Sequence, residues 1–310
     1  MATANVSDEK QNYSEKAHDL YCSLDKDTAI HGQFTFIAVL NAFLSIAVFL
    51  GNVLVLVALH RVSLLHPPTK LLFRSLAVTD LCAGLFSEPL FVTLLVTVLN
   101  EHWKICRYLA VTVFTTGEIL TLVSMLTLNA VSVDRLLALL LGLGYRQVVT
   151  LKRTRLMIIV FWVLSAGFTT ARLLWKLRII SKYRAIVTSL CLVTSTFSHT
   201  KIFFTLRRHQ NQVQDLVQPA NQTNQLNVAR FRKAVSTALW LQFTLVACYL
   251  PVISANLFMK TEPSSSYSVA FSDTLTLVFL NSSLNPILYC WKIDEVRQGM
   301  RETIRQILCC

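Results

Sequence analysis

Long apolar segments alternate with short polar segments along most of this chain. Each apolar segment has the roughly 20 residues that a helix needs to cross a bilayer. The seven segments are 34–60, 71–99, 106–138, 155–175, 185–207, 230–259 and 268–291. The fifth is the most polar, because Ser195, Thr196, Ser198 and His199 interrupt it. The pattern predicts an all-α membrane protein whose residues 34–291 form a seven-transmembrane helix bundle.

The C-terminal segment 292–310 has a different pattern. Its apolar residues recur at helical spacing among charged ones: Ile293, Val296, Met300, Ile304 and Ile307. This spacing predicts a short amphipathic eighth helix on the cytoplasmic membrane surface. Cys309 and Cys310 follow it, and we expect them to carry palmitoyl groups; the alternative is two free thiols.

The N-terminal segment 1–33 is polar and is expected to be extracellular. It contains two glycosylation sequons, at Asn5 and Asn12. With the N-terminus outside, the segments inside the cell hold 18 of the 29 lysines and arginines. Such a bias is typical of cytoplasmic segments, although the connection between spans four and five is also basic. We therefore expect a multi-pass protein of the plasma membrane.

Composition narrows the possible functions. The chain is 54% hydrophobic and 15% charged, which is too apolar for a soluble domain. Its net charge is +12, and the cationic residues sit between the apolar segments. We therefore expect contacts with membrane lipids and none with nucleic acid. No nucleophile pair, metal-ligand cluster or phosphate-binding loop indicates an enzyme. A small transporter is a weaker alternative, because no internal repeat is visible.

Polar residues inside the apolar segments are the most informative, and the densest group is 281–289. Pro286 lies in it, lacks a backbone donor and should kink the helix. In lipid the carbonyl that it frees needs a partner within the protein. Asn281, Ser282 and Asn285 are candidate partners, or they bind water or an ion.

Further markers occur in order in the other spans. They are Asn52, Leu76 with Asp80, Arg135, Trp162, Pro251 and Pro286, the two prolines marking helix kinks. With them, residues 34–305 resemble the rhodopsin-like (class A) G-protein-coupled receptors, near the melanocortin and adenosine receptors. The resemblance implies a receptor that binds an extracellular small molecule or peptide and activates a heterotrimeric G protein. The alternative is a receptor-like protein that couples weakly or not at all.

The resemblance implies an ion and water cluster around Asp80. Its other members would be Asn52, Ser124, Asn281 and Asn285, with sodium held by Asp80 and Ser124. Oxygen ligands suit a hard cation. The alternative is a protonated Asp80 in a simple network of hydrogen bonds between helices.

A G-protein switch is implied at the cytoplasmic side. Asp134 would restrain Arg135 at rest, although the pair could instead be an ordinary interfacial salt bridge. His199 replaces a tyrosine that normally reaches toward Tyr289. Span six begins with basic residues, where many relatives carry an acidic partner for Arg135. We therefore expect raised ligand-independent signalling.

The ligand site is expected toward the extracellular side. Glu88, Glu118 and Tyr249 are the candidate ligand-binding residues, and Tyr249 stands where the family has a switch tryptophan. The two carboxylates either recognise a cation or pair with a basic residue such as Arg107 or Arg172. Span seven contains no lysine, so no retinal is expected.

An outer disulfide is usual in the resembled family. Cys106 lies about one turn earlier than expected relative to Arg135, and the connection between spans four and five has no cysteine. Cys22 is the remaining plausible outer partner, so we expect a Cys22–Cys106 bridge.

Overall fold

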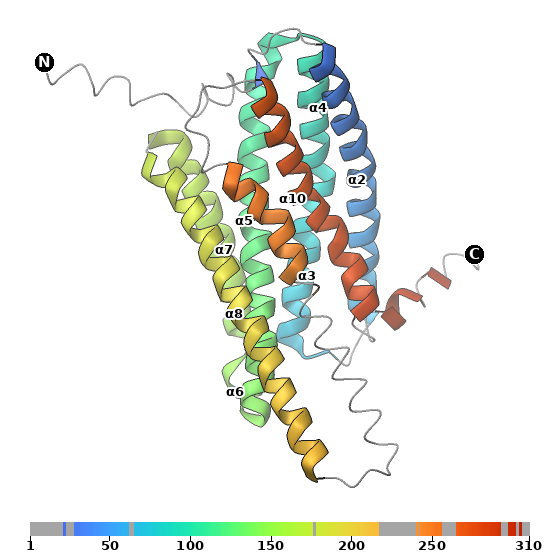
Figure 1. Cartoon of the computed structure of the whole chain (residues 1–310), viewed down its shortest axis with the longest axis vertical. Coiled ribbons are helices and arrows are strands. Elements are labelled where there is room, and N and C mark those ends of the chain that lie inside the picture. Colours follow the sequence, from blue (N-terminus) through green and yellow to red (C-terminus); the bar gives the residue numbers. More distant parts are fainter. Residues whose placement is uncertain are drawn as a thin grey trace, which may run out of the picture.

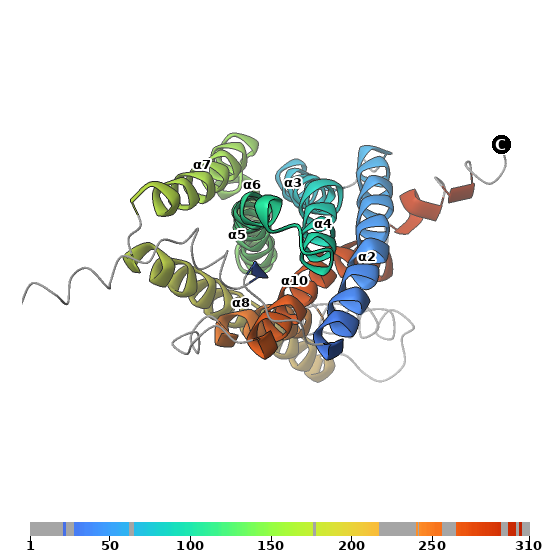
Figure 2. The ribbon, with the colours of Figure 1, turned by 90° about the horizontal axis from the view of Figure 1, so that it is seen from above.

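The protein is built from long helices that lie side by side (Figures 1 and 2). The computed structural model of the chain describes residues 21–22, 28–61, 65–175, 178–216, 240, 242–255, 265–292, 297–301 and 304–305, and no strand occurs among them. The predicted sites Asn5, Asn12, Cys309 and Cys310 lie outside the described residues.

The helices follow the expected spans in order. They are α2 (Thr28–Arg61), α3 (Pro67–Cys82), the π-helical turn η2 (Ala83–Ser87), α4 (Glu88–Leu99), α5 (Trp103–Leu141), the short η3 (Gly142–Gly144) and α6 (Tyr145–Val148), α7 (Leu151–Trp175), α8 (Arg178–Leu216) and α10 (Ser265–Lys292). A further helical segment covers Gln242–Ala255. The elements α3, η2 and α4 form one continuous span, Pro67–Leu99.

Helix α5 lies at the centre of the arrangement. It packs against α3 and α4 on one side and against α7 and α8 on the other, as the view along the bundle shows (Figure 2). Helix α2 packs between α4 and α10. Most of the other helices therefore contact α5, and polar residues on it can meet partners from several directions.

Four helices in the described part are long and apolar enough to cross a membrane: Ile30–Arg61, Pro67–Leu99, Trp103–Leu141 and Leu151–Leu173. Helices α8 and α10 have 39 and 28 residues, and polar residues interrupt both. Large apolar side chains point outward, such as Phe36, Phe43 and Val163 at 67%, 69% and 64% exposure. Asp80 and Asn52 are buried instead, which is the distribution that lipid favours. The predicted all-α membrane bundle is confirmed.

The connection expected between spans four and five is mostly helical. Helix α7 ends at Trp175, and α8 already begins at Arg178. The segment 178–216 contains no proline or glycine, so no residue in it stops the helix. The expected boundaries were therefore too narrow, because hydropathy marks the membrane-embedded part of a helix and not its ends.

A disulfide joins Cys22 to Cys106 of α5, as expected, with 5.9 Å between the two Cα atoms. Tyr21 beside it is fully buried, and its hydroxyl lies 2.7 Å from that of Ser272 in α10. We call this end of the bundle the disulfide end, and the opposite end, with Asp134 of α5, the Asp134 end.

Part of the segment expected to form the amphipathic helix is described, and residues 297–301 and 304–305 are helical. Met300 is 5% exposed and belongs to the same buried cluster as Leu59 and Leu72, so it packs at the Asp134 end of α2 and α3. Ile304, expected on the same apolar face, is 42% exposed. The amphipathic helix over 292–310 stays a prediction.

Helix α2 approaches the second span closely at the π-helical turn. Ser45 donates its hydroxyl to the carbonyl of Gly84 at 2.7 Å. A Cβ atom on Gly84 would lie 2.8 Å from Cγ1 of Val48 and 3.1 Å from the backbone nitrogen of Phe49. Only glycine fits there without movement of α2.

We predict that Gly84→Ala lowers the free energy of unfolding by about 1–3 kcal/mol, because the added methyl group overpacks a helix contact. Gly167→Ala is the matched control, since nothing lies within 4 Å of a Cβ atom there. Thermal melting of the two purified variants in detergent measures the difference. An equal melting temperature for both would show that α2 and η2 are not held in this contact.

Candidate functional site

A buried carboxylate, Asp80 of α3, accepts hydrogen bonds from two other helices. Ser124 of α5 and Ser282 of α10 donate to its Oδ1 at 3.1 and 2.9 Å. Asn285 of α10 donates Nδ2 to its Oδ2 at 2.7 Å. Asp80 is 1% exposed, so these donors replace the water that the carboxylate lost. The carboxylate thus links α3, α5 and α10.

Asn52 of α2 extends this cluster to a fourth helix. Pro286 lies inside α10 and has no N–H, so the carbonyl of Ser282, four residues earlier, loses its helical donor. Asn52 donates Nδ2 to that carbonyl oxygen at 3.3 Å. The side chains of Ser282 and Asn285 are engaged by Asp80, so the partner comes from α2 and not from the 281–289 stretch.

The cluster differs from the expected set in two members. Asn281 is buried but makes no hydrogen bond to Asp80, and its Nδ2 has no partner among the described residues. Ser282, which was not in the expected set, bonds to Asp80 instead of Asn281. Asn281 and Ser282 lie four and three residues before Asn285, so both share its helix face and spacing alone does not say which one reaches Asp80.

The residues of the cluster fit a sodium ion. Asp80, Ser124 and Ser282 offer carboxylate and hydroxyl oxygens, the ligands that a hard cation prefers. Oδ1 of Asn52 is also buried without a hydrogen-bond partner in the described part of the chain. Buried polar atoms of this kind are normally satisfied by water or an ion.

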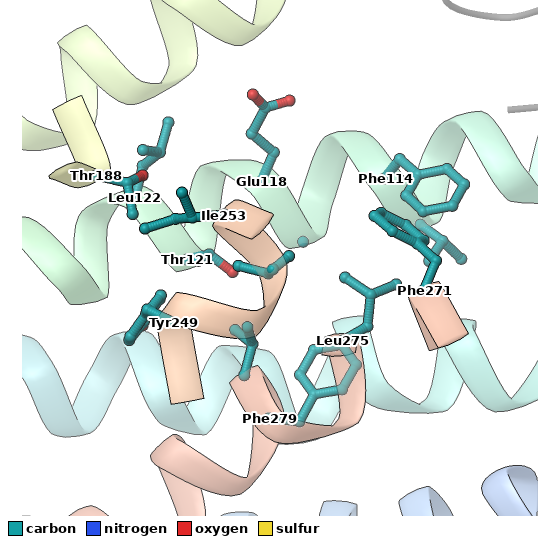
Figure 3. A pocket seen from close by; sticks show the side chains of 14 residues that line it. Phe114, Glu118, Thr121, Leu122, Thr188, Tyr249, Ile253, Phe271, Leu275 and Phe279 are labelled. Carbon is teal, nitrogen blue, oxygen red and sulfur yellow. The ribbon is translucent and has the colours of Figure 1, made fainter. Parts of the chain in front are cut away.

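A cavity of about 80 Å³ lies between α5, α8, the Gln242–Ala255 segment and α10, toward the disulfide end from Asp80 (Figure 3). Its lining includes two of the expected ligand-binding residues, Glu118 and Tyr249. Tyr249 is 2% exposed and packs in the same buried cluster as Met125 of α5, the residue next to Ser124. One side chain therefore lines the cavity and packs against α5 near the polar cluster.

Glu118 is paired within the protein. Oε2 of Glu118 forms an ion pair with Nη2 of Arg172 in α7, and both side chains are buried. Of the two alternatives for this carboxylate, the structure shows pairing with a basic residue. Removing either partner would break this buried ion pair and lower the free energy of unfolding by about 3–5 kcal/mol.

Glu88, the third expected ligand-binding residue, does not line the cavity. It is fully buried at the start of α4, and neither carboxylate oxygen has a hydrogen-bond partner in the described part of the chain. A role of Glu88 in ligand binding stays a prediction; the π-helical turn η2 lies just before this residue and changes the rotation of the helix there. Hydropathy does not reveal such a turn.

At the Asp134 end, the expected pair of Asp134 and Arg135 is absent from the described residues. Asp134 instead accepts hydrogen bonds from Thr69 at 2.9 Å and from Tyr145 of α6 at 2.5 Å. Burial and the bond to Asp134 raise the pKa of Tyr145 to about 12, so its hydroxyl stays protonated as a donor. Arg135 lies 5.4 Å from the ring centroid of Phe73. The hydroxyls of Thr69 and Tyr145 satisfy the Asp134 carboxylate, so Arg135 is not held by an ion pair with Asp134 and its side chain is exposed.

His199 belongs to a network that joins α8 to the Gln242–Ala255 segment. Nδ1 of His199 lies 3.1 Å from Oε1 of Gln242, and Ser195 donates to that oxygen at 3.0 Å. Gln242 donates Nε2 to Thr196 at 2.6 Å. We call these four residues the Gln242 clamp. The predicted contact of His199 with Tyr289 involves a side chain outside the described part.

Comparisons with known proteins agree with this arrangement. The family described as "7 transmembrane receptor (rhodopsin family)" matches residues 51–185. Adenosine receptor A2b of Bos taurus is 30% identical, covering 84% of this chain and 86% of that receptor. The human A2b receptor is 28% identical, and the match covers 87% of this chain and 89% of that receptor. Melanocortin receptor 5 of Bos taurus is 26% identical, and the match covers 84% of this chain and 80% of that receptor. The similarity thus extends over most of the chain.

Proposed function

Because this chain belongs to the rhodopsin family of seven-transmembrane receptors, we propose that it binds an extracellular ligand in the cavity and then activates a heterotrimeric G protein. Membership makes it a multi-pass G-protein-coupled receptor and not an enzyme. In the proposal the protein lies in the plasma membrane with the N-terminus and the disulfide end outside. The Asp134 end then faces the cytoplasm.

The position of Tyr249 is the observation that carries the proposal. Tyr249 lines the cavity and packs in one buried cluster with Met125, the neighbour of Ser124, which donates to Asp80. A ligand that displaces this ring would disturb the hydrogen bonds between α5, α3 and α10. Buried polar networks switch between discrete arrangements, so a small displacement can shift whole helices.

Arg135 supplies the cytoplasmic contact in this proposal. It is exposed at the Asp134 end, and Asp134 beside it is already satisfied by Thr69 and Tyr145. No ion pair with Asp134 has to break before the arginine reaches a G protein. The Gln242 clamp, which holds the sixth span against α8, is then the restraint on opening.

A sodium ion at Asp80 is part of the proposal. Asp80, Ser124 and Ser282 would hold it, and its charge would balance a carboxylate that is costly at membrane depth. The donors already bound to Asp80 order these oxygens around one point.

We predict that Arg135→Ala abolishes G-protein activation, because the exposed guanidinium is lost from the cytoplasmic face. The measurement is a G-protein dissociation assay in cells, read without ligand and against amines, nucleosides and peptides. Arg155→Ala, another exposed arginine at the same end, is the matched control and should leave the signal unchanged. Full activity of Arg135→Ala would refute the proposal. Ligand binding without dissociation in the unmodified chain would favour the weakly coupling alternative.

We predict that Gln242→Leu raises signalling without ligand, because it removes the polar contacts between α8 and the sixth span. The unmodified receptor should already signal above an empty-vector baseline, since the sequence offers no acidic residue at the start of that span to restrain Arg135. Thr244→Val is the control: among the described residues, Thr244 bonds to the carbonyl of Trp240, four residues earlier, and not to α8. Equal baselines for both variants would show that the clamp does not restrain opening.

We predict that sodium chloride raises the melting temperature of the purified receptor relative to equal choline chloride. Asp80→Asn should lose this difference, because the site loses its charge. Asp273→Asn should keep it, since Asp273 is exposed and forms none of the described hydrogen bonds of the cluster. A receptor whose melting temperature ignores sodium would support the simple hydrogen-bond network around a protonated Asp80.

A further inference from the structure

The lining of the cavity indicates what kind of ligand it accepts. Most of the lining side chains are apolar, and three are phenylalanines from α5 and α10: Phe114, Phe271 and Phe279. The rings of Phe114 and Phe271 lie 5.9 Å apart between centroids. Such walls favour an apolar body, and aromatic faces favour a flat ring.

Among the described residues, no unbalanced charge lines the cavity. Glu118 is the one charged residue in this described lining, and it is paired with Arg172. In Figure 3 the carboxylate of Glu118 points away from Phe271, Leu275 and Phe279. A ligand ammonium group would have to displace Arg172, and a ligand carboxylate would have to displace Glu118. Either exchange breaks the buried ion pair of Glu118 and Arg172, which is costly.

Two hydroxyl groups are available for hydrogen bonds with a ligand. Thr121 of α5 and Thr188 of α8 both line the cavity, and their hydroxyls make no hydrogen bond to other described residues. A hydroxyl group both donates and accepts, so it can bind a neutral carbonyl, hydroxyl or amide. Neither requires a charged ligand.

The N-terminal segment limits the size of the ligand. The ring of Tyr21 lies 5.7 Å from that of Phe114, and its neighbour Cys22 is tied to α5 by the disulfide. Tyr21 therefore packs against a lining residue of the cavity at the disulfide end. The cavity volume of about 80 Å³ is well below the roughly 300 Å³ at which drug-sized pockets begin. A whole peptide does not fit.

We infer that the ligand of the proposed receptor site is a compact, uncharged and largely apolar small molecule with a ring, and that the pair of Glu118 and Arg172 excludes ions. This inference rests on the proposed function for the identity of the site. Of the two alternatives for Glu118, it favours pairing with a basic residue over recognition of a cationic ligand.

Thiol-reactive probes test the inference without a known ligand. Leu275→Cys places a thiol in the cavity, and Asn100→Cys places one in the exposed turn after α4 as a reference. Each variant of the full receptor is treated with benzyl, trimethylammonium-ethyl and sulfonato-ethyl methanethiosulfonate. The thiolate attacks the reagent's sulfenyl sulfur, forms a mixed disulfide and releases methanesulfinate. The unmodified receptor corrects for its native cysteines.

We predict that Leu275→Cys reacts with the neutral benzyl reagent about tenfold or more faster than with either ion, relative to Asn100→Cys; tenfold corresponds to about 1.4 kcal/mol. Faster reaction with the cationic trimethylammonium-ethyl reagent would instead indicate that the cavity binds cations. Equal relative rates would show an open, aqueous cavity. Both results overturn the inference.

A second set of variants tests the cause of the selectivity. Added to Leu275→Cys, Glu118→Gln should accelerate the anionic reagent, and Arg172→Gln should accelerate the cationic one. The double change should restore the preference for the neutral reagent, and Glu88→Gln should leave all ratios unchanged. Unchanged ratios in both single variants would refute the role of the ion pair. The assay needs no G protein, so a receptor that fails to couple does not affect its outcome.

Discussion

The carboxylate of Asp80 is the constraint around which the other buried polar residues are arranged. A carboxylate at membrane depth is costly unless the protein supplies its hydrogen bonds. Ser124, Ser282 and Asn285 supply three, and they come from the two helices that lie on either side of α3 in this cluster. The positions of α3, α5 and α10 are therefore linked, and any ligand or ion that changes one of these bonds acts on three helices together.

Pro286 imposes a second requirement on the same helices. It frees the carbonyl of Ser282, and Asn52 satisfies that carbonyl from α2. Gly51 makes this possible, because a Cβ atom there would lie 3.1 Å from Cγ of Pro286. The neighbouring residues Gly51 and Asn52 thus allow α2 to approach the proline and to donate to the carbonyl that the proline frees. Two irregularities, in separate helices, compensate each other.

The sequence predicted the fold well because each span follows from hydropathy, a property of single residues. It also predicted which helices carry Asp80, Ser124 and Asn285, and the pairing of Cys22 with Cys106. It did not predict the partner of Asp134 or the place of Glu88. Tyr145 reaches Asp134 through the short helices η3 and α6, and Glu88 follows a π-helical turn. Both depend on local backbone geometry, which no residue pattern in one sequence specifies.

The two ends of the bundle restrain the receptor by different means. At the disulfide end, a covalent bond and the packing of Tyr21 fix the segment over the cavity. At the Asp134 end, hydrogen bonds between neutral side chains hold α8 against the sixth span. Each such bond contributes about 0.5–1.5 kcal/mol, far less than a covalent bond, so this end opens at lower cost. In the proposed function, a ligand that moves Tyr249 therefore acts on a bundle that is held more firmly at the disulfide end than at the Asp134 end. That asymmetry directs the opening toward Arg135.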